Sequence, residues 1–213
     1  MKKYFPLFCL MVLLSACATE TATDKADDTA TEVEQAPEPQ WISLLDSNSA
    51  EGWRAYGGDS LPPGWLVENG ILTFDTELGL EQDYIGGKGV IYGDEEFDNF
   101  ELSLEWKLPK GGNSGIFYHL KEGYSGPPEI APEYQIIDDE NYAAIHNLTE
   151  YNESLGYKEN PAALQPLQQT ASDYAMHPAD PDKKKLHPIG EWNSSKIVFT
   201  PENVEHWLNG QMV

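Results

Sequence analysis

Cysteine is nearly absent from this sequence of 213 residues, which contains only Cys9 and Cys17. Because both lie close to the N-terminus, the rest of the chain can form neither a disulfide nor a metal site built on thiolates. The stability of its folded part must therefore come from packing. The residues from Trp41 to Val213 are numerous enough for one domain that buries about two-thirds of its unfolded surface.

Positive charge is also scarce. Lysine and arginine together number 13 against 36 aspartates and glutamates, which gives a formal net charge of -23, and Arg54 is the sole arginine. A surface this negative repels phosphate backbones, and one guanidinium cannot form a cluster for phosphate or carboxylate ligands. The composition therefore excludes a nucleic-acid partner and favours a neutral ligand.

Long hydrophobic runs are missing, because the apolar stretch from Tyr4 to Leu14 is well short of the roughly 20 residues that cross a bilayer. It follows Lys2 and Lys3 and ends in Leu14-Ser15-Ala16-Cys17. This pattern predicts a secretory signal peptide over residues 1–16. The last four residues resemble a bacterial lipobox, which implies lipidation of Cys17 and an exported protein anchored to a bacterial membrane, in the periplasm or on the cell surface. The alternative is an ordinary signal with an incidental cysteine.

Residues 17–40 lack aromatic side chains and are rich in Thr, Ala, Glu, Asp and Pro. Such a composition cannot bury enough apolar surface to offset the entropy of an ordered chain. We therefore expect a disordered, acidic tether between the lipid and a single folded domain over residues 41–213.

Helical periodicity is scarce, whereas two-residue alternation recurs between turns. The run 64–74 carries Asn69-Gly70 at its centre, the strongest short hairpin signal, and Phe100–Leu108 alternates strictly between apolar and polar residues. Further strands are predicted at Gly115–Leu120, Glu133–Ile137, Lys196–Thr200 and Val204–Leu208. The pattern predicts an all-β, antiparallel two-sheet sandwich, with long loops over Asp138–Glu191. Because only Gln211–Val213 follow the Asn209-Gly210 turn, we also expect at least one further strand beyond Val213.

The usual catalytic signatures are absent, including HExxH, Gly-x-Ser-x-Gly and the phosphate-binding and dinucleotide-binding glycine loops. The five histidines, which are His119, His146, His177, His187 and His206, show no metal-ligand spacing. The remaining candidates are polar side chains that lie on predicted strands. Glu105 and His119 lie on two of them, and alternation places Glu133 and Gln135 on one face of a third. Polar side chains in this arrangement suit sugar hydroxyls, but alternation alone favours a solvated sheet face.

The segment Glu133–Asp138 superficially resembles the carboxylate strand of sandwich-fold endoglucanases. The middle acid of that motif is replaced by Gln135, and Asp138 falls on the opposite face from Glu133 unless a bulge intervenes. The paired carboxylates of a retaining glycosidase are therefore not expected here.

Several motifs in a fixed order are distinctive together. They are Gly52-Trp53, Gly64-Trp65-Leu66-Val67-Glu68-Asn69-Gly70, Glu105-Trp106-Lys107, Gly112-Asn113-Ser114-Gly115-Ile116-Phe117, Glu133-Tyr134-Gln135-Ile136-Ile137-Asp138, Gly190-Glu191-Trp192-Asn193 and Val204-Glu205-His206-Trp207-Leu208-Asn209-Gly210. The set resembles the 3-keto-disaccharide hydrolase family. That resemblance implies a concanavalin-like jelly roll and cleavage of glycosides already oxidised to a ketone at sugar carbon 3. The sequence departs from the family in having His119 where an arginine is usual, and in lacking a later Gly-His-Gly loop and Phe-Arg-Asn segment.

The implied chemistry needs a general base, a donor for the developing enolate and an acid near the leaving oxygen. We assign Glu133 as base or acid, with His119, Glu105 and Asp138 as further catalytic candidates. Candidate substrate ligands are Gln135, Asn113, Glu191 and Tyr174. Asp138 and Glu191 could instead cap turns, and Asn113 could support its own loop.

The sequence identifies no certain cofactor, and a divalent cation held by these carboxylates stays open as an electrophile. An oxidoreductase partner is expected to supply the keto sugar. The main alternative function is a non-catalytic, lectin-like module that uses Trp53, Trp65 or Trp207 as stacking platforms.

Overall fold

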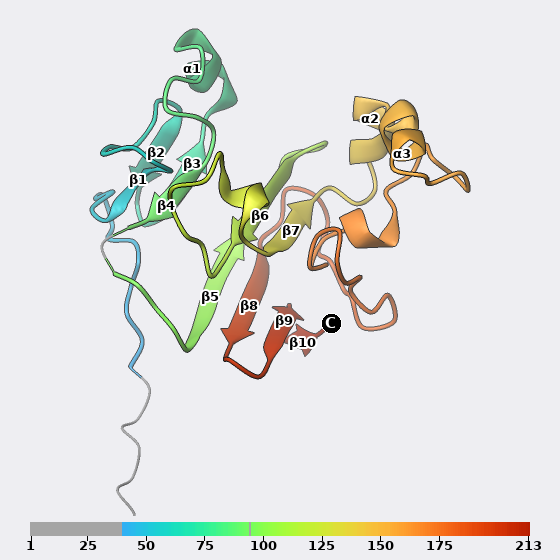
Figure 1. Cartoon of the computed structure of the whole chain (residues 1–213). Helices are drawn as coiled ribbons and strands as arrows, with labels where there is room; N and C mark the ends of the chain where they lie inside the picture. The colour runs from blue at the N-terminus through green and yellow to red at the C-terminus, as the bar shows by residue number, and fades with distance from the viewer. Residues whose placement is uncertain (1–39, 94) are drawn as a thin grey trace, which may run out of the picture. The chain divides into compact units, whose positions relative to one another are not determined.

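A computed structural model describes residues 40–93 and 95–213, of which residues 42–213 form one compact unit. The signal peptide, Cys17 and the tether up to residue 39 lie outside the described residues. Strands dominate the described part (Figure 1). They are β1 (Trp53–Ala55), β2 (Trp65–Glu68), β3 (Ile71–Phe74), β4 (Val90–Tyr92), β5 (Phe100–Trp106), β6 (Asn113–Phe117), β7 (Glu133–Ile137), β8 (Asn193–Phe199), β9 (Val204–Leu208) and β10 (Gln211–Met212).

The helices of the described part are short. They are α1 (Thr76–Glu81), α2 (Tyr142–His146), α3 (Thr149–Ser154) and the 3-10 turns η1 (Pro127–Glu129) and η2 (Pro166–Gln168). Within the described residues, none approaches the length and hydropathy of a bilayer-spanning helix.

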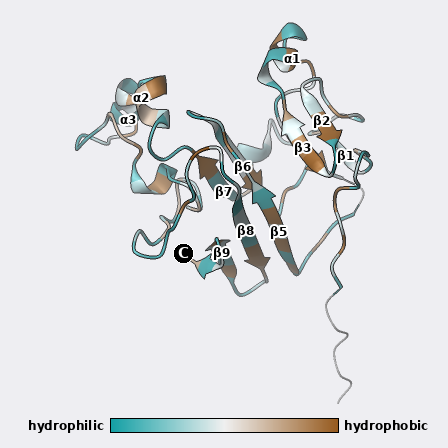
Figure 2. Cartoon of the chain, turned by 180° about the vertical axis from the view of Figure 1, so that it is seen from behind, coloured by the Kyte–Doolittle hydropathy of each residue, from teal (hydrophilic) through white to brown (hydrophobic). Residues whose placement is uncertain are grey.

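One layer of the fold is a four-stranded antiparallel sheet in the order β10-β9-β8-β5. Strict alternation in β5 turns Phe100, Leu102 and Trp106 inward and leaves Glu101 and Glu105 exposed. The hydropathy colouring concentrates the apolar residues of this layer on β5 and β8 (Figure 2). The amphipathic pattern read from the sequence therefore defines the buried face of the sheet.

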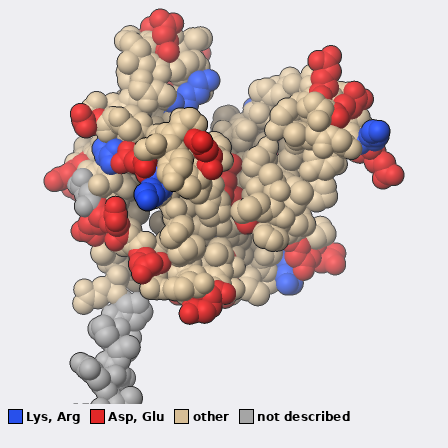
Figure 3. Space-filling view, viewed as in Figure 1, with Lys and Arg blue, Asp and Glu red and all other residues tan. Residues whose placement is uncertain are grey.

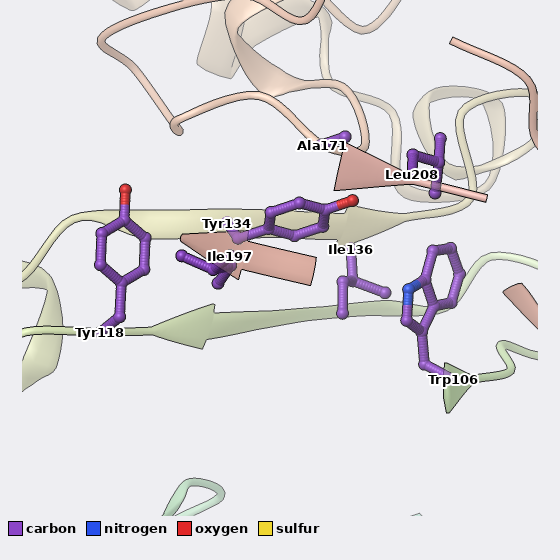
Figure 4. Packing of buried hydrophobic residues seen from close by; sticks show 7 residues of the cluster. All are labelled: Trp106, Tyr118, Tyr134, Ile136, Ala171, Ile197 and Leu208. Carbon is purple, nitrogen blue, oxygen red and sulfur yellow. The ribbon is translucent and has the colours of Figure 1, made fainter. Parts of the chain in front are cut away.

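The second layer is the antiparallel pair β6–β7, in which Gly115 faces Gln135 and Ile116 faces Tyr134. Tyr134 and Ile136 point from β7 into the space between the layers, where they meet side chains of the first sheet (Figure 4). The core cluster comprises Trp106, Tyr118, Tyr134, Ile136, Ala171, Ile197 and Leu208. Two antiparallel layers with a shared apolar core confirm the predicted all-β class.

A third backbone segment, residues 171–174, runs alongside β7. Tyr134 and Asp173 form an antiparallel bridge, and the N–H of Tyr174 donates to the carbonyl of Glu133 at 2.9 Å. His206 of β9 holds the segment from the core side, with Nδ1 3.0 Å from the carbonyl of Ala171. Since that carbonyl can only accept, Nδ1 carries the proton, and Nε2 accepts the hydroxyl of Tyr118 at 3.1 Å.

Two further hairpins precede β5. In β2–β3, Asn69 and Gly70 have φ angles of 52° and 76°, as a two-residue type I′ turn requires, so the predicted hairpin is confirmed. The short pair β1–β4 was not predicted, because three residues are too few to show alternation. Arg54 of β1 forms a bidentate pair with Glu122 and thereby ties this region to the loop that follows β6.

Several predicted elements differ from the structure. The strand expected at 115–120 covers Asn113–Phe117, and His119 beyond it has a φ of 52°, which no strand residue adopts. The strand expected from Lys196 begins at Asn193, where it pairs with Trp106. The long loops expected over 138–191 contain α2, α3 and η2.

Candidate functional site

The candidate site is the face of β6–β7 that points away from the core. Register and alternation place Glu133, Gln135 and Ile137 of β7 on this face, opposite Phe117, Gly115 and Asn113 of β6. The sequence therefore alternates along β7 between core residues and residues that face the site.

A cavity of about 290 Å³ lies on this face. Strands β6 and β7 supply part of its lining, and the segment that carries α2, α3 and η2 supplies the rest. The lining residues are Asn113, Gln135, Ile137, Tyr142, Leu148, Tyr151, Leu164, Gln168 and Tyr174. None of these side chains is a cation or a carboxylate, so the cavity suits a neutral, hydroxyl-rich ligand.

Glu133 stands beside this cavity at the start of β7. Burial raises the pKa of its carboxyl from the ordinary 4.5 to about 7. The carboxyl lies over the backbone of Gly115, in the space that a side chain at that position would fill. A group with this pKa can accept or release a proton near neutral pH, which is the property a general acid or base needs.

Gln135 offers a hydrogen-bond donor to the cavity. Its Oε1 accepts the N–H of Ile136 at 2.9 Å, which identifies the oxygen and leaves the NH₂ group as the end available to a ligand. The residue is only 4% exposed. Asn113, on the neighbouring strand, directs its NH₂ group toward the hydroxyl of Tyr142 at 3.4 Å. Two amides therefore border the same space.

Two tyrosine hydroxyls meet above the strands, since those of Tyr151 and Tyr174 are 3.2 Å apart. Burial, the hydrogen bond with Tyr151 and the nearby charge of Glu133 all raise the pKa of Tyr174. Tyr174 thus keeps its proton at neutral pH and remains a hydrogen-bond donor.

A buried amide network holds the wall of the cavity. The NH₂ group of Asn152 donates to the carbonyls of Pro161 and Ala163 at 2.8 and 2.9 Å, and its Oδ1 accepts from Gln168 at 2.8 Å. The Oε1 of Gln168 in turn accepts the N–H of Gln165. Because every polar atom of the Asn152 side chain is used, the network fixes α3 against η2.

Asp138 takes the turn-capping role, which was the alternative to catalysis considered from the sequence. It is fully buried, and its oxygens accept the N–H groups of Gly111, Glu140 and Asn141 and the side-chain NH₂ of Asn141. Burial alone would raise the pKa of Asp138, but these hydrogen bonds outweigh it and lower the pKa below its usual value. With about four acceptor positions occupied, Asp138 caps the turn before α2 and is not available as a base.

The structure does not bring Glu105, His119 or Glu191 to this cavity. Glu105 is exposed on the outer face of β5. His119 stacks on Phe199, with ring centroids 4.8 Å apart, and lines a separate hollow of about 440 Å³ beside the β8–β9 turn. Glu191 is exposed in the turn before β8. Geometry therefore favours Glu133, Gln135, Asn113 and Tyr174 among the residues predicted from sequence.

Sequence reasoning missed Tyr142, Tyr151 and Gln168, since the segment that carries them was expected to form loops. The available signal was the concentration of tyrosines between residues 142 and 174 in a stretch otherwise rich in polar residues. Among the described residues, no group of three or more His, Cys, Asp or Glu side chains is placed to hold a metal ion.

The indole N–H groups of the three tryptophans considered as stacking platforms are hydrogen-bonded within the protein. The indole N–H of Trp53 donates to the carbonyl of Leu44, and that of Trp65 donates to the carbonyl of Lys88. Trp207 donates to Glu205, and Lys196 lies over its ring at 4.4 Å.

Comparison with known proteins places these features in context. Residues 40–213 match the family described as the 3-keto-alpha-glucoside-1,2-lyase-like domain. A protein of Bacteroides thetaiotaomicron named 3-keto-disaccharide hydrolase is 36% identical over 183 residues, which cover 81% of this chain and 57% of that protein. The chain thus spans little more than half the length of that relative.

Two crystal structures from Parabacteroides distasonis, each described only as a candidate glycosyl hydrolase, are similar in fold. One has a TM-score of 0.60 and 30% identity, covering 79% of this chain and 69% of the other. The second has a TM-score of 0.50 and 20% identity, with 81% and 63% covered.

Proposed function

Because this chain belongs to the 3-keto-alpha-glucoside-1,2-lyase-like family, we propose that its folded domain cleaves the glycosidic bond of a sugar oxidised to a ketone at carbon 3. The observation that carries the proposal is the placement of Glu133, with its pKa near 7, beside an uncharged cavity lined by amides and tyrosines. The relative's name, 3-keto-disaccharide hydrolase, supports the same class of substrate.

The ketone at carbon 3 makes the proton on carbon 2 acidic. The Glu133 carboxylate removes that proton, and the electron pair of the broken C2–H bond forms a C1=C2 double bond as the C1–O bond breaks. Water then adds across the double bond, with hydroxide at carbon 1 and the proton returned to carbon 2, so that the net reaction is hydrolysis. A positioned base contributes roughly 10² to 10⁴ in rate to such a step.

The negative charge that develops on the ketone oxygen needs a hydrogen-bond donor. The NH₂ group of Gln135 fits this role, because its oxygen is fixed by Ile136 and its donor end borders the cavity. Asn113 offers a second donor on the adjacent strand. Buried donors of this kind stabilise an enolate without reorganising during the reaction.

The leaving oxygen needs a proton. The paired hydroxyls of Tyr151 and Tyr174 border the cavity, and Tyr174 lies near Glu133. They would hydrogen-bond the departing alkoxide while solvent supplies the net proton. In this assignment Tyr174 both binds the substrate and stabilises the leaving group.

The proposed activity is tested by Glu133→Gln in the full-length chain, assayed on a 3-keto-disaccharide and on its unoxidised parent. We expect selective turnover of the keto sugar by the wild-type protein and a loss of at least about 10²-fold in kcat in the variant, because the amide cannot take the C2 proton. Glu105→Gln, on the outer face of β5, is the matched control and should retain full turnover.

The same assay repeated with a chelator decides whether a divalent cation contributes to the reaction. No turnover of either sugar by folded protein that still binds the keto sugar would contradict the hydrolase assignment for those substrates. That outcome would favour the lectin-like alternative.

We further propose that the chain is exported and anchored through lipid on Cys17. Support comes from the basic, apolar and lipobox-like succession over residues 1–17 and from the acidic stretch that follows it. An oxidoreductase that forms the 3-ketone must act before this protein, because the proposed elimination requires a carbonyl beside the carbon that loses its proton. Cell fractionation tests the placement of the chain.

A further inference from the structure

Gly115 stands in the middle of β6, directly opposite Gln135 and two residues from the partner of Glu133. A methyl group built onto Gly115 would overlap the Glu133 side chain, and its three closest neighbours are Oε1, Cδ and Cγ of that residue. The carboxyl of Glu133 therefore lies across the strand, on the bare backbone of Gly115, within van der Waals distance.

Backbone conformation gives no reason for a glycine at this position. The φ angle of Gly115 is outside the left-handed region, so any L-residue could adopt it. A glycine in the interior of a strand weakens the strand, by about 0.5–1 kcal/mol relative to alanine, and often marks a close approach by another group. The group that approaches here is the carboxyl of Glu133.

We propose that Gly115 is the positioning residue of the site, since the missing side chain at 115 creates the seat that holds the Glu133 carboxyl against β6 beside the cavity. The catalytic consequence of this inference rests on the proposed function, whereas the seat itself does not. Gly115 would contact no reacting atom and would act through Glu133 alone.

The seat also explains the desolvation of Glu133. No ionisable residue of β6 shares this face, because the residues opposite β7 are Asn113, Gly115 and Phe117. The ionisable group that faces Glu133 from the paired segment is Tyr174, which Tyr151 of α3 reaches in turn. Burial against the backbone is thus the main influence on the carboxyl, and moving it off Gly115 would expose it to water.

The test is Gly115→Ala in the full-length chain, with glutamate carboxyls labelled with ¹³C and the Glu133 signal identified by its loss in Glu133→Gln. We expect the titration midpoint of Glu133 to fall from about 7 toward the ordinary value, because the new methyl group pushes the end of a flexible side chain into solvent. Turnover of the keto sugar should fall about 10²-fold, through kcat more than KM, and the acidic limb of the pH profile should move down with the midpoint.

Gly89→Ala is the matched control, because a methyl group there meets nothing within 4 Å and the backbone is outside the left-handed region. It should leave the Glu133 titration unchanged. Glu133→Asp tests the same seat without a change at position 115, because the shorter side chain cannot reach across to the glycine. The carboxyl of that variant should titrate near the ordinary range for aspartate.

A folded Gly115→Ala protein in which Glu133 titrates as in the wild type would overturn the seat, whatever the activity. A wild-type protein in which Glu133 titrates at the ordinary value for glutamate would also overturn the seat. By contrast, Glu133→Gln with full turnover would overturn the proposed base and leave the seat to be judged by titration alone.

Discussion

Glu133 and Asp138 are five residues apart on one stretch of chain, yet their carboxyls lie in opposite environments. Asp138 receives backbone N–H groups and its pKa is lowered, whereas Glu133 meets the uncharged backbone of Gly115 and its pKa is raised. Hydrogen bonds to the charged form stabilise it, and desolvation without such bonds destabilises it. The difference decides which of the two can exchange protons near neutral pH.

The raised pKa of Glu133 makes the fold sensitive to pH. The native state keeps a proton that the unfolded state has lost, so the free energy of unfolding falls as pH rises from about 4.5 to about 7. Glu133→Gln removes this penalty. Because Glu133 is only partly buried, we expect the variant to gain about 1–2 kcal/mol over the wild type between pH 4 and pH 8.

Urea unfolding at the two pH values measures this change. A stability difference between variant and wild type that is the same at both would contradict it. If the prediction holds, Glu133→Gln is more stable than the wild type at alkaline pH but lacks the proposed activity. This is the trade-off expected where an active site keeps a destabilising group.

Sequence patterns identified Glu133, Gln135, Asn113 and Tyr174 as candidates, because alternation assigns the face of a strand residue and the family motif marks the strand. They could not distinguish Glu133 from Asp138 or exclude Glu105. Those distinctions depend on which backbone groups reach each carboxyl and on which layer each strand joins, and both are properties of the folded chain.

At the scale of elements, the loop after residue 179 is clasped to the site segment by one buried ion pair. The Nζ of Lys184 lies 2.7 Å from Asp139 and 2.6 Å from the Oε1 of Gln169, and the two charged side chains are only 12% and 14% exposed. Asp139 also accepts the N–H of Thr170 at 2.8 Å. The clasp thus anchors the backbone that leads into residues 171–174.

We expect Lys184→Met to cost about 3 kcal/mol of unfolding free energy, because it leaves the Asp139 carboxylate buried without a cation. Lys183→Met is the control one residue away. Its pair with Asp180 is 3.3 Å long and largely exposed, so its loss should cost about 0.5 kcal/mol or less. Denaturant midpoints of the two variants compare them directly, and equal costs would contradict a buried clasp.

Hairpins were predictable because their turns carry a local signal. Asn69-Gly70 and Asn209-Gly210 both place two successive residues at positive φ, a demand that few dipeptides meet. The helices α2 and α3 carry no comparable signal, since each spans only five or six residues and neither has a side-chain N-cap. Helix α1 does have one, because Asp75 accepts the N–H groups of Glu77 and Leu78, and it could have been predicted from that residue.

At the scale of the whole molecule, acidic side chains spread across the face in view and basic ones are few (Figure 3). A net charge of -23 keeps such a chain away from anionic surfaces unless a covalent lipid holds it there. The proposed anchor and the charge of the protein therefore act in opposite directions at a membrane.

Lipidation is tested by Cys17→Ser, with Cys9→Ser, inside the preceding signal peptide, as the control. We expect the wild type and the Cys9 variant to incorporate labelled palmitate and to sediment with membranes. The Cys17 variant should do neither, because the acyl chains have no other attachment point. Palmitate incorporation by the Cys17 variant would contradict the assignment.

The two-layer architecture was predictable from alternation alone, because a strict two-residue period in β5 requires one face to be covered. The pairing of residues 171–174 with β7 was not. It joins Tyr134 to Asp173, nearly forty residues later, through an isolated bridge. Residues 171–174 show no strand-like pattern in the sequence.

That pairing has a consequence for the choice of ligand. Tyr174 is delivered to the site by backbone bonds to β7, while Tyr142, Leu148, Tyr151 and Leu164 are carried by the intervening excursion of the chain. Insertions, deletions or substitutions within that excursion would reshape the cavity wall, including the position of Tyr151, and leave the backbone pairing of Tyr174 with β7 unchanged. Changes in that excursion would therefore alter which ligands the cavity admits without disturbing the strand pairing that carries Glu133 and Gln135.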